Sequence, residues 1–140
     1  MLCVGVLFFG SLSGCNKPVS IGNDDRTLEL ASGSVQLGPG VTLHDMGVKS
    51  SRKGDFLPQQ ITAKVGDVVR FTSRDTRTHA LQILAPTPEA RTMLQPSSQL
   101  RSPPLVERGQ AWVVSLKGLP AGTYTVSCLS HAGVATLIIQ

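Results

Sequence analysis

The chain has 140 residues, of which 41% are hydrophobic and 16% charged, and this composition predicts one globular domain with a single core. The formal net charge is +4, but the Lys and Arg residues are scattered, and only four Phe, one Tyr and one Trp accompany them. These features argue against a surface that stacks nucleic-acid bases, so we expect no nucleic-acid partner.

Residues 1–15 read MLCVGVLFFGSLSGC, an apolar run too short to span a bilayer that ends in small residues and a cysteine. The tetrapeptide LSGC, which ends at Cys15, resembles the bacterial lipobox. The resemblance implies a signal peptide over residues 1–14, lipidation of Cys15, and anchoring in the bacterial cell envelope facing the periplasm or the exterior. No Lys or Arg precedes the apolar run, so either the true start of the protein lies upstream of Met1 or the segment is a plain apolar tail.

Residues 15–27 are largely polar and contain Gly and Asp, which predicts a flexible tether that begins at the lipidated cysteine. Residues 28–140 would form the domain. Because Cys3 would leave with the signal peptide, the domain would keep a single free thiol, Cys128. A free thiol in an oxidising compartment is oxidised unless it is buried, bound to metal or chemically used. Cys128 is therefore the first candidate for a functional residue.

The domain contains short β-type runs separated by turn residues, and this pattern predicts an antiparallel β-sandwich or barrel. The runs cover residues 28–37, 41–48, 59–65, 68–72, 79–84, 110–116, 123–129 and 134–139. Residues 86–109 are the exception, because Thr87 can cap a helix, Glu89 lies in its first turn and Pro96 ends it. We expect one short helix there, followed by an irregular loop rich in Ser and Pro.

Alternation in the run TYTVSCL places Tyr124, Val126 and Cys128 on one face, so Cys128 is expected to point inward at the end of its strand. His131 follows in a tight turn, and His79 begins an earlier strand. A sandwich can bring such strand ends to one pole. Two imidazoles and one thiolate that meet there would form a set of ligands that suits copper.

Three separated segments resemble cupredoxins, and the similarity extends from about residue 55 to residue 140. FLPQQITAKVGDVVRF, from Phe56, is similar to the family's F-x-P-x-x-I-x-V-x-x-G-D-x-V-x-F segment. Asp75 with His79 resembles the segment of the first histidine ligand, and GTYTVSCLSH, which ends at His131, resembles the G-x-Y-x-x-x-C-x-x-H ligand loop. The resemblance implies a Greek-key β-sandwich with one type 1 copper ion held by His79, Cys128 and His131.

Two positions depart from the family pattern. Val134 occupies the position of the axial methionine, and since valine cannot coordinate, the implied site is three-coordinate. Ala80 replaces an Asn or Ser whose hydrogen bonds stiffen the ligand loop in many members. Met46 or His44 is a conceivable fourth donor, the alternative being an ordinary strand residue in the core or on the surface. Met93, in the predicted helix, is expected in the core.

The resemblance further implies a non-enzymatic electron carrier, in which the ring of His131 exchanges electrons with a docked partner such as a cytochrome or an oxidase. Small, weak interfaces suit such exchange. The surface patch around the ring would consist of Leu129, Ala132 and Gly133.

Arg74 and Arg77, just before His79, could steer an acidic partner toward this patch. Two other functions stay open: copper handling, and a metal-free cupredoxin-like interaction module of a membrane complex. A catalytic pair of Cys128 and His131 fits less well, because no residue nearby in the sequence suggests itself as the orienting third member.

Overall fold

The structure is a computed structural model, and it describes residues 26–30, 33–52, 55–95 and 99–140. The predicted signal peptide over residues 1–14, the predicted lipidation site Cys15 and most of the predicted tether lie outside these ranges. Within them, no helix is both long enough and apolar enough to cross a membrane.

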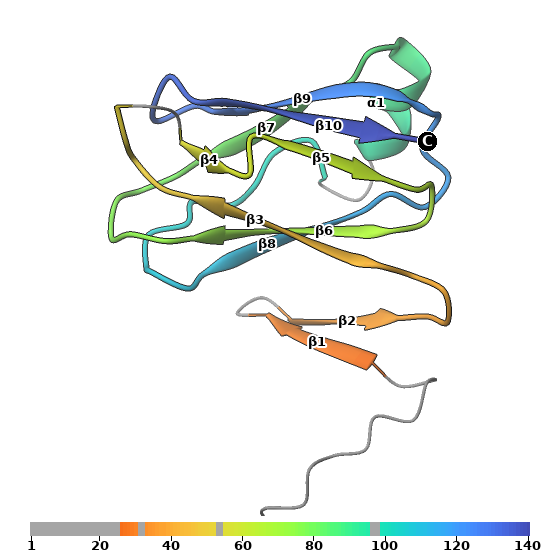
Figure 1. The fold of residues 1–140 in the computed structure, drawn as a ribbon, viewed down its shortest axis with the longest axis horizontal. Helices are drawn as coiled ribbons and strands as arrows, with labels where there is room; N and C mark the ends of the chain where they lie inside the picture. The colour runs from red at the N-terminus through yellow and green to blue at the C-terminus, as the bar shows by residue number, and fades with distance from the viewer. Residues whose placement is uncertain (1–25, 31–32, 53–54, 96–98) are drawn as a thin grey trace, which may run out of the picture.

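Two four-stranded sheets face each other across one hydrophobic core (Figure 1). In order across the first sheet, the strands are β5 (Gln60–Ala63), β10 (Val134–Ile139), β9 (Gly122–Cys128) and β7 (Leu81–Leu84). In order across the second, they are β4 (Phe56–Leu57), β3 (Leu43–Val48), β6 (Val68–Ser73) and β8 (Ala111–Ser115). The predicted all-β sandwich with one short helix is confirmed.

The core forms because alternate residues of the strands point into the space between the sheets. Tyr124, Val126 and Cys128 are all buried along β9, as the alternation predicted. Phe71 of β6 and Trp112 of β8 stack with ring centroids 5.4 Å apart. Burial of such side chains contributes roughly 25 cal/mol per Å² of apolar surface, and this is the main force that holds the two sheets together.

The prediction of antiparallel pairing was wrong for two strand pairs. β3 pairs with β6 in parallel, and β5 pairs with β10 in parallel. Between β3 and β6 the chain forms β4, crosses to the other sheet to form β5, and then returns. Because such a crossover brings the chain back to the starting end of β3, the new strand can run in the same direction. Short apolar runs do not reveal these crossovers.

The predicted helix is confirmed as α1 (Pro88–Leu94). The side-chain oxygen of Thr87 accepts a hydrogen bond from the backbone N–H of Ala90 at 3.2 Å, which caps the helix. Ala90 and Leu94 are buried against the core. Met93 was expected in the core, but it lies on the outer face and is 45% exposed, so that prediction was wrong.

The first predicted run, residues 28–37, is two strands rather than one. β1 (Arg26–Leu30) and β2 (Gly33–Leu37) pair antiparallel, with Arg26 opposite Leu37. They form a separate two-stranded sheet beside the sandwich (Figure 1). β1 therefore begins inside the range predicted as tether, residues 15–27.

Candidate functional site

The candidate site lies at one end of the sandwich, where three connections between strands meet. Figure 1 shows the β3–β4, β6–β7 and β9–β10 connections together at its left end. His79 belongs to the β6–β7 connection, and His131 to the β9–β10 connection. The fold thus brings together residues that are about fifty positions apart in the sequence.

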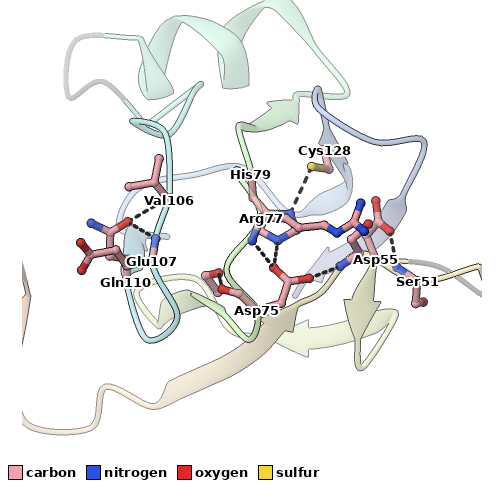
Figure 2. Close-up of polar contacts among 11 residues, drawn as sticks. Ser51, Asp55, Asp75, Arg77, His79, Val106, Glu107, Gln110 and Cys128 are labelled. Carbon is pink, nitrogen blue, oxygen red and sulfur yellow. Dashed lines mark hydrogen bonds and ion pairs between the residues drawn. The ribbon is translucent and has the colours of Figure 1, made fainter.

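His79 is fully buried and is fixed through both its backbone and its ring. Its backbone N–H donates to the carbonyl of Leu105 at 2.9 Å, and its carbonyl accepts from the N–H of Leu105 at 2.8 Å. Figure 2 shows the ring between the carboxylate of Asp75 and the sulfur of Cys128. The Nε2 atom lies 2.7 Å from the Asp75 carboxylate.

Asp75 is ionised and accepts several hydrogen bonds. Burial opposes its ionisation, but hydrogen bonds from His79 and from the backbone N–H groups of Ser50 and Arg77 outweigh that effect and lower the pKa of Asp75 from 3.8 to about 2. An ionised carboxylate can only accept hydrogen bonds, so Nε2 of His79 carries the proton. In the neutral ring Nδ1 is then unprotonated, and its lone pair can bind a metal ion or accept a hydrogen bond from a thiol.

Cys128 is the last residue of β9, and its side chain is only 4% exposed. Its Sγ atom lies 3.7 Å from Nδ1 of His79 (Figure 2). The register of the sheet accounts for this approach, because Cys128 pairs with Leu81, two residues after His79. A soft sulfur and an imidazole lone pair therefore face each other in a buried space.

His131 is the third predicted donor, and the structure places it with the other two. Its ring centroid lies 5.3 Å from that of His79, with the two planes inclined at 55°. Its Nε2 atom is buried and has no hydrogen-bond partner among the described residues. An unsatisfied buried polar atom typically costs about 1–3 kcal/mol, so this nitrogen fits a site that receives a ligand.

The donor set fits copper in its chemistry, since two imidazoles and a thiolate suit Cu(I) and Cu(II) better than hard cations. The side chains lie near one another without forming a closed coordination site. Within the described ranges, no group of three or more His, Cys, Asp or Glu side chains is arranged so that it could hold a metal ion.

The main chain connects the ligand loop to the neighbouring segments. The N–H of Cys128 donates to the carbonyl of Gly133 at 3.0 Å, which closes the loop that contains His131. The N–H of Leu129 donates to the carbonyl of Ala80 at 2.6 Å. The sequence suggested that Ala80, which lacks a polar side chain, leaves this loop without support. The backbone carbonyl of the same residue provides a connection.

The structure gives other roles to the residues considered as a fourth donor. Met46 is fully buried in the core. Nε2 of His44 lies 2.9 Å from the carboxylate of Asp67. Both residues therefore fit the alternative of an ordinary strand residue. Val134, which the resemblance to cupredoxins places at the axial position, begins β10 and is 54% exposed.

The surface around the site combines apolar side chains with an adjoining basic cleft. Leu129 and Ala132 of the predicted patch are exposed, but Gly133 is buried, so its inclusion was wrong. The cleft has a volume of about 860 Å³, and its lining includes the exposed Leu57, the buried Asp55 and three cationic side chains. These are Lys49, Arg74 and Arg108, none of which forms a salt bridge with a described residue.

Sequence reasoning did not find Asp55, a buried carboxylate beside the ligand loop. It accepts a hydrogen bond from the backbone N–H of Gly133 at 3.1 Å. A single aspartate before the F-x-P segment gives no signal in the sequence for a contact with a residue 78 positions away.

No protein-family model matches the chain, and no curated protein matches it. Several solved structures are similar. Oxidised plastocyanin from Dryopteris crassirhizoma is 22% identical, with a TM-score of 0.56 over 69% of this chain and 99% of that one. A variant of amicyanin in a reduced Cu(I) form is 18% identical, with a TM-score of 0.50 over 74% and 86%. Reduced auracyanin from Roseiflexus castenholzii is 11% identical, with a TM-score of 0.50 over 72% and 99%. The chain therefore has a cupredoxin fold.

Proposed function

We propose that the protein is a copper-binding electron carrier in which His79, Cys128 and His131 hold one type 1 copper ion. The observation that supports this most directly is the 3.7 Å approach of the Cys128 sulfur to Nδ1 of His79, with the His131 ring beside them. Two solved structures of the same fold, the oxidised plastocyanin and the Cu(I) amicyanin variant, are described by their redox state.

The residues of the chain would each have a defined task. Bound copper would supply a one-electron couple between Cu(I) and Cu(II). Cys128 would lose its proton and offer a thiolate, while Asp75 keeps the proton of His79 on Nε2 and leaves Nδ1 free to coordinate. The aliphatic Val134 would contribute no fourth donor, and loss of a weak axial thioether raises the reduction potential.

A redox partner such as a cytochrome or an oxidase would dock where His131 approaches the surface. Leu129 and Ala132 are exposed there and offer a small apolar contact, as transient redox interfaces require. The cations of the adjoining cleft, Lys49, Arg74 and Arg108, would attract an acidic partner and speed its association. We expect this association to weaken as salt concentration rises.

The same proposal places the protein in the bacterial cell envelope, facing the periplasm or the exterior. Lipidation of Cys15 would anchor it to the membrane, and the part of the predicted tether, residues 15–27, that precedes β1 would connect the anchor to the domain. The protein would act as a carrier and not as an enzyme.

The test is to add Cu(II) to the purified full chain and to record its visible spectrum. We expect an intense thiolate-to-copper absorption that disappears on reduction and returns on reoxidation. Cys128→Ser should abolish this absorption, because a hydroxyl oxygen is a poor substitute for the soft thiolate. Cys15→Ser is the matched control and should keep it.

Two outcomes would contradict the proposal. A chain that stays colourless and retains no copper would indicate a metal-free interaction module. A chain that binds copper but releases it on reduction, or passes it readily to a chelator, would indicate copper handling instead of electron transfer.

A further inference from the structure

Asp55 lies directly before β4 and is 4% exposed, although it takes no part in the cluster of histidines and cysteine. We propose that Asp55 is a positioning residue that fixes the loop between β9 and β10, and with it the placement of Cys128 and His131. The consequence for copper rests on the proposed function, whereas the effect on the loop does not.

The carboxylate of Asp55 joins two segments that are distant in sequence. Its Oδ2 accepts from the N–H of Gly133 at 3.1 Å, and its Oδ1 accepts from the N–H of Ser51 at 3.3 Å (Figure 2 shows the Ser51 contact). Its backbone carbonyl accepts from the N–H of Lys49 at 2.8 Å. The residue is thus held by the β3–β4 connection while its side chain reaches the ligand loop.

Gly133 transmits this constraint to Cys128. Its N–H is held by Asp55, and its carbonyl accepts from the N–H of Cys128 at 3.0 Å. The N–H of His131 in turn donates to the carbonyl of Cys128 at 3.4 Å. One buried glycine therefore fixes both ends of the short loop that carries His131, and the carboxylate fixes the glycine.

The contact between Asp55 and Gly133 is also close. A Cβ atom at Gly133 would overlap the Cβ of Asp55 and would lie 2.5 Å from its Cγ and from Oδ2. Real side chains do not approach so closely, so the position accepts only glycine while Asp55 is present. Tight packing of this kind leaves the loop little room to move away from the carboxylate.

The charge of Asp55 gives it a second effect on the same site. Asp55 and His131 line the same small hollow of about 290 Å³, together with Gly133 and the cationic Arg52, whose charge acts in the opposite direction. A nearby negative charge stabilises the more positive, oxidised state of a bound metal. Asp55 should therefore lower the reduction potential of the copper site, in opposition to the effect of the missing axial donor.

Asp67 offers a matched control at the other end of the sandwich. It is equally buried and also accepts two backbone N–H groups, from Thr42 and Lys64. It lies at the β5–β6 connection, which Figure 1 shows at the opposite end from the ligand loop. Substitution of Asp67 should lower stability without changing the loop.

The first experiment uses the metal-free full chain and measures exchange of the Gly133 amide hydrogen by NMR. Asp55→Ala removes the acceptor and should speed this exchange by about tenfold or more. Asp67→Ala should speed the exchange of the Gly133 amide only as much as it speeds exchange of the core amides, through its effect on global unfolding. Asp55→Asn keeps the side-chain volume and one acceptor oxygen, so it should fold and give an intermediate rate. Unchanged exchange in both Asp55 variants would overturn the proposal.

The second experiment uses the copper-loaded chain and compares Asp55→Asn with Asp67→Asn. The first should raise the reduction potential and shift the thiolate-to-copper band, and the second should do neither. If the reduction potential and the absorption band shift equally in the two variants, Asp55 contributes only to the stability of the fold, and the assignment as a positioning residue is refuted. If the parent chain binds no copper, the proposed function fails, but the amide exchange still decides whether Asp55 fixes the loop.

Discussion

At the scale of single residues, the Asp75 carboxylate determines which nitrogen of His79 is available. It holds the proton on Nε2, and the lone pair of Nδ1 then faces the sulfur of Cys128. Such outer partners of a metal-binding histidine fix both its protonation and its orientation. The candidate site therefore extends beyond the three predicted donors.

We predict that Asp75→Ala weakens copper binding by about 10- to 100-fold, because the ring of His79 loses the acceptor that fixes its orientation and its protonated nitrogen. Competition with a copper chelator measures the affinity, and ¹⁵N NMR of the metal-free chain reports the protonation of the ring. Asp45→Ala is the control, because that carboxylate pairs with Arg70 on an exposed part of the surface. An unchanged affinity would show that the contact is incidental.

The sequence predicted part of the candidate site because those residues obey local rules. Alternation along β9 predicted that Cys128 points inward, and the resemblance to cupredoxins pointed to His79 and His131. Asp55 was not predictable, because its contact with Gly133 depends on how two connections pack at the end of the sandwich. A hydrogen bond between residues so far apart leaves no periodic signal in one sequence.

At the scale of elements, α1 depends on its cap. The helix has only seven residues, and helices this short gain most of their stability from capping and from packing. Thr87 supplies the cap, while Ala90 and Leu94 supply the packing.

We predict that Thr87→Ala lowers the free energy of unfolding by about 1 kcal/mol, because the N–H of Ala90 loses its acceptor. Thr92→Ala is the control. The hydroxyl of Thr92 donates back to the carbonyl of Pro88 on the exposed face, so alanine there should be neutral or slightly stabilising. Urea denaturation of the metal-free chain measures both variants, and equal losses would contradict the assignment of the cap.

Strands were easier to predict than their pairing. A short β-type run bounded by turn residues needs only its own sequence to be recognised, and β6, β8, β9 and β10 were all predicted in this way. The parallel pairs β3–β6 and β5–β10 depend on which sheet each strand joins. That choice depends on packing across the core, which a single run does not encode.

At the scale of the whole molecule, the two ends of the sandwich contain different groups of polar residues. One end holds the candidate site, and the other holds the Asp67 carboxylate at the β5–β6 connection. Burial opposes ionisation of Asp67, but hydrogen bonds from His44 and from the N–H groups of Lys64 and Thr42 outweigh it, so the pKa of Asp67 falls below 3.8.

We predict that Asp67 makes stability depend on pH. A carboxyl group whose pKa is lower in the folded state contributes fully above its unfolded pKa of 3.8, and the contribution is lost as the pH falls through the lower folded value. Asp67→Asn should therefore be less stable than the parent at neutral pH, and the difference should shrink under acidic conditions. Urea denaturation of the metal-free chain at several pH values measures this, and a difference that stays constant with pH would contradict it.

The bond between the carbonyl of Ala80 and the N–H of Leu129 has a consequence for how the site tolerates mutation. A hydrogen bond between two peptide groups does not depend on the side chain at position 80. It is lost only where a residue such as proline removes the N–H donor at position 129. Variation at position 80 is therefore a poor guide to whether relatives of this chain have a rigid loop.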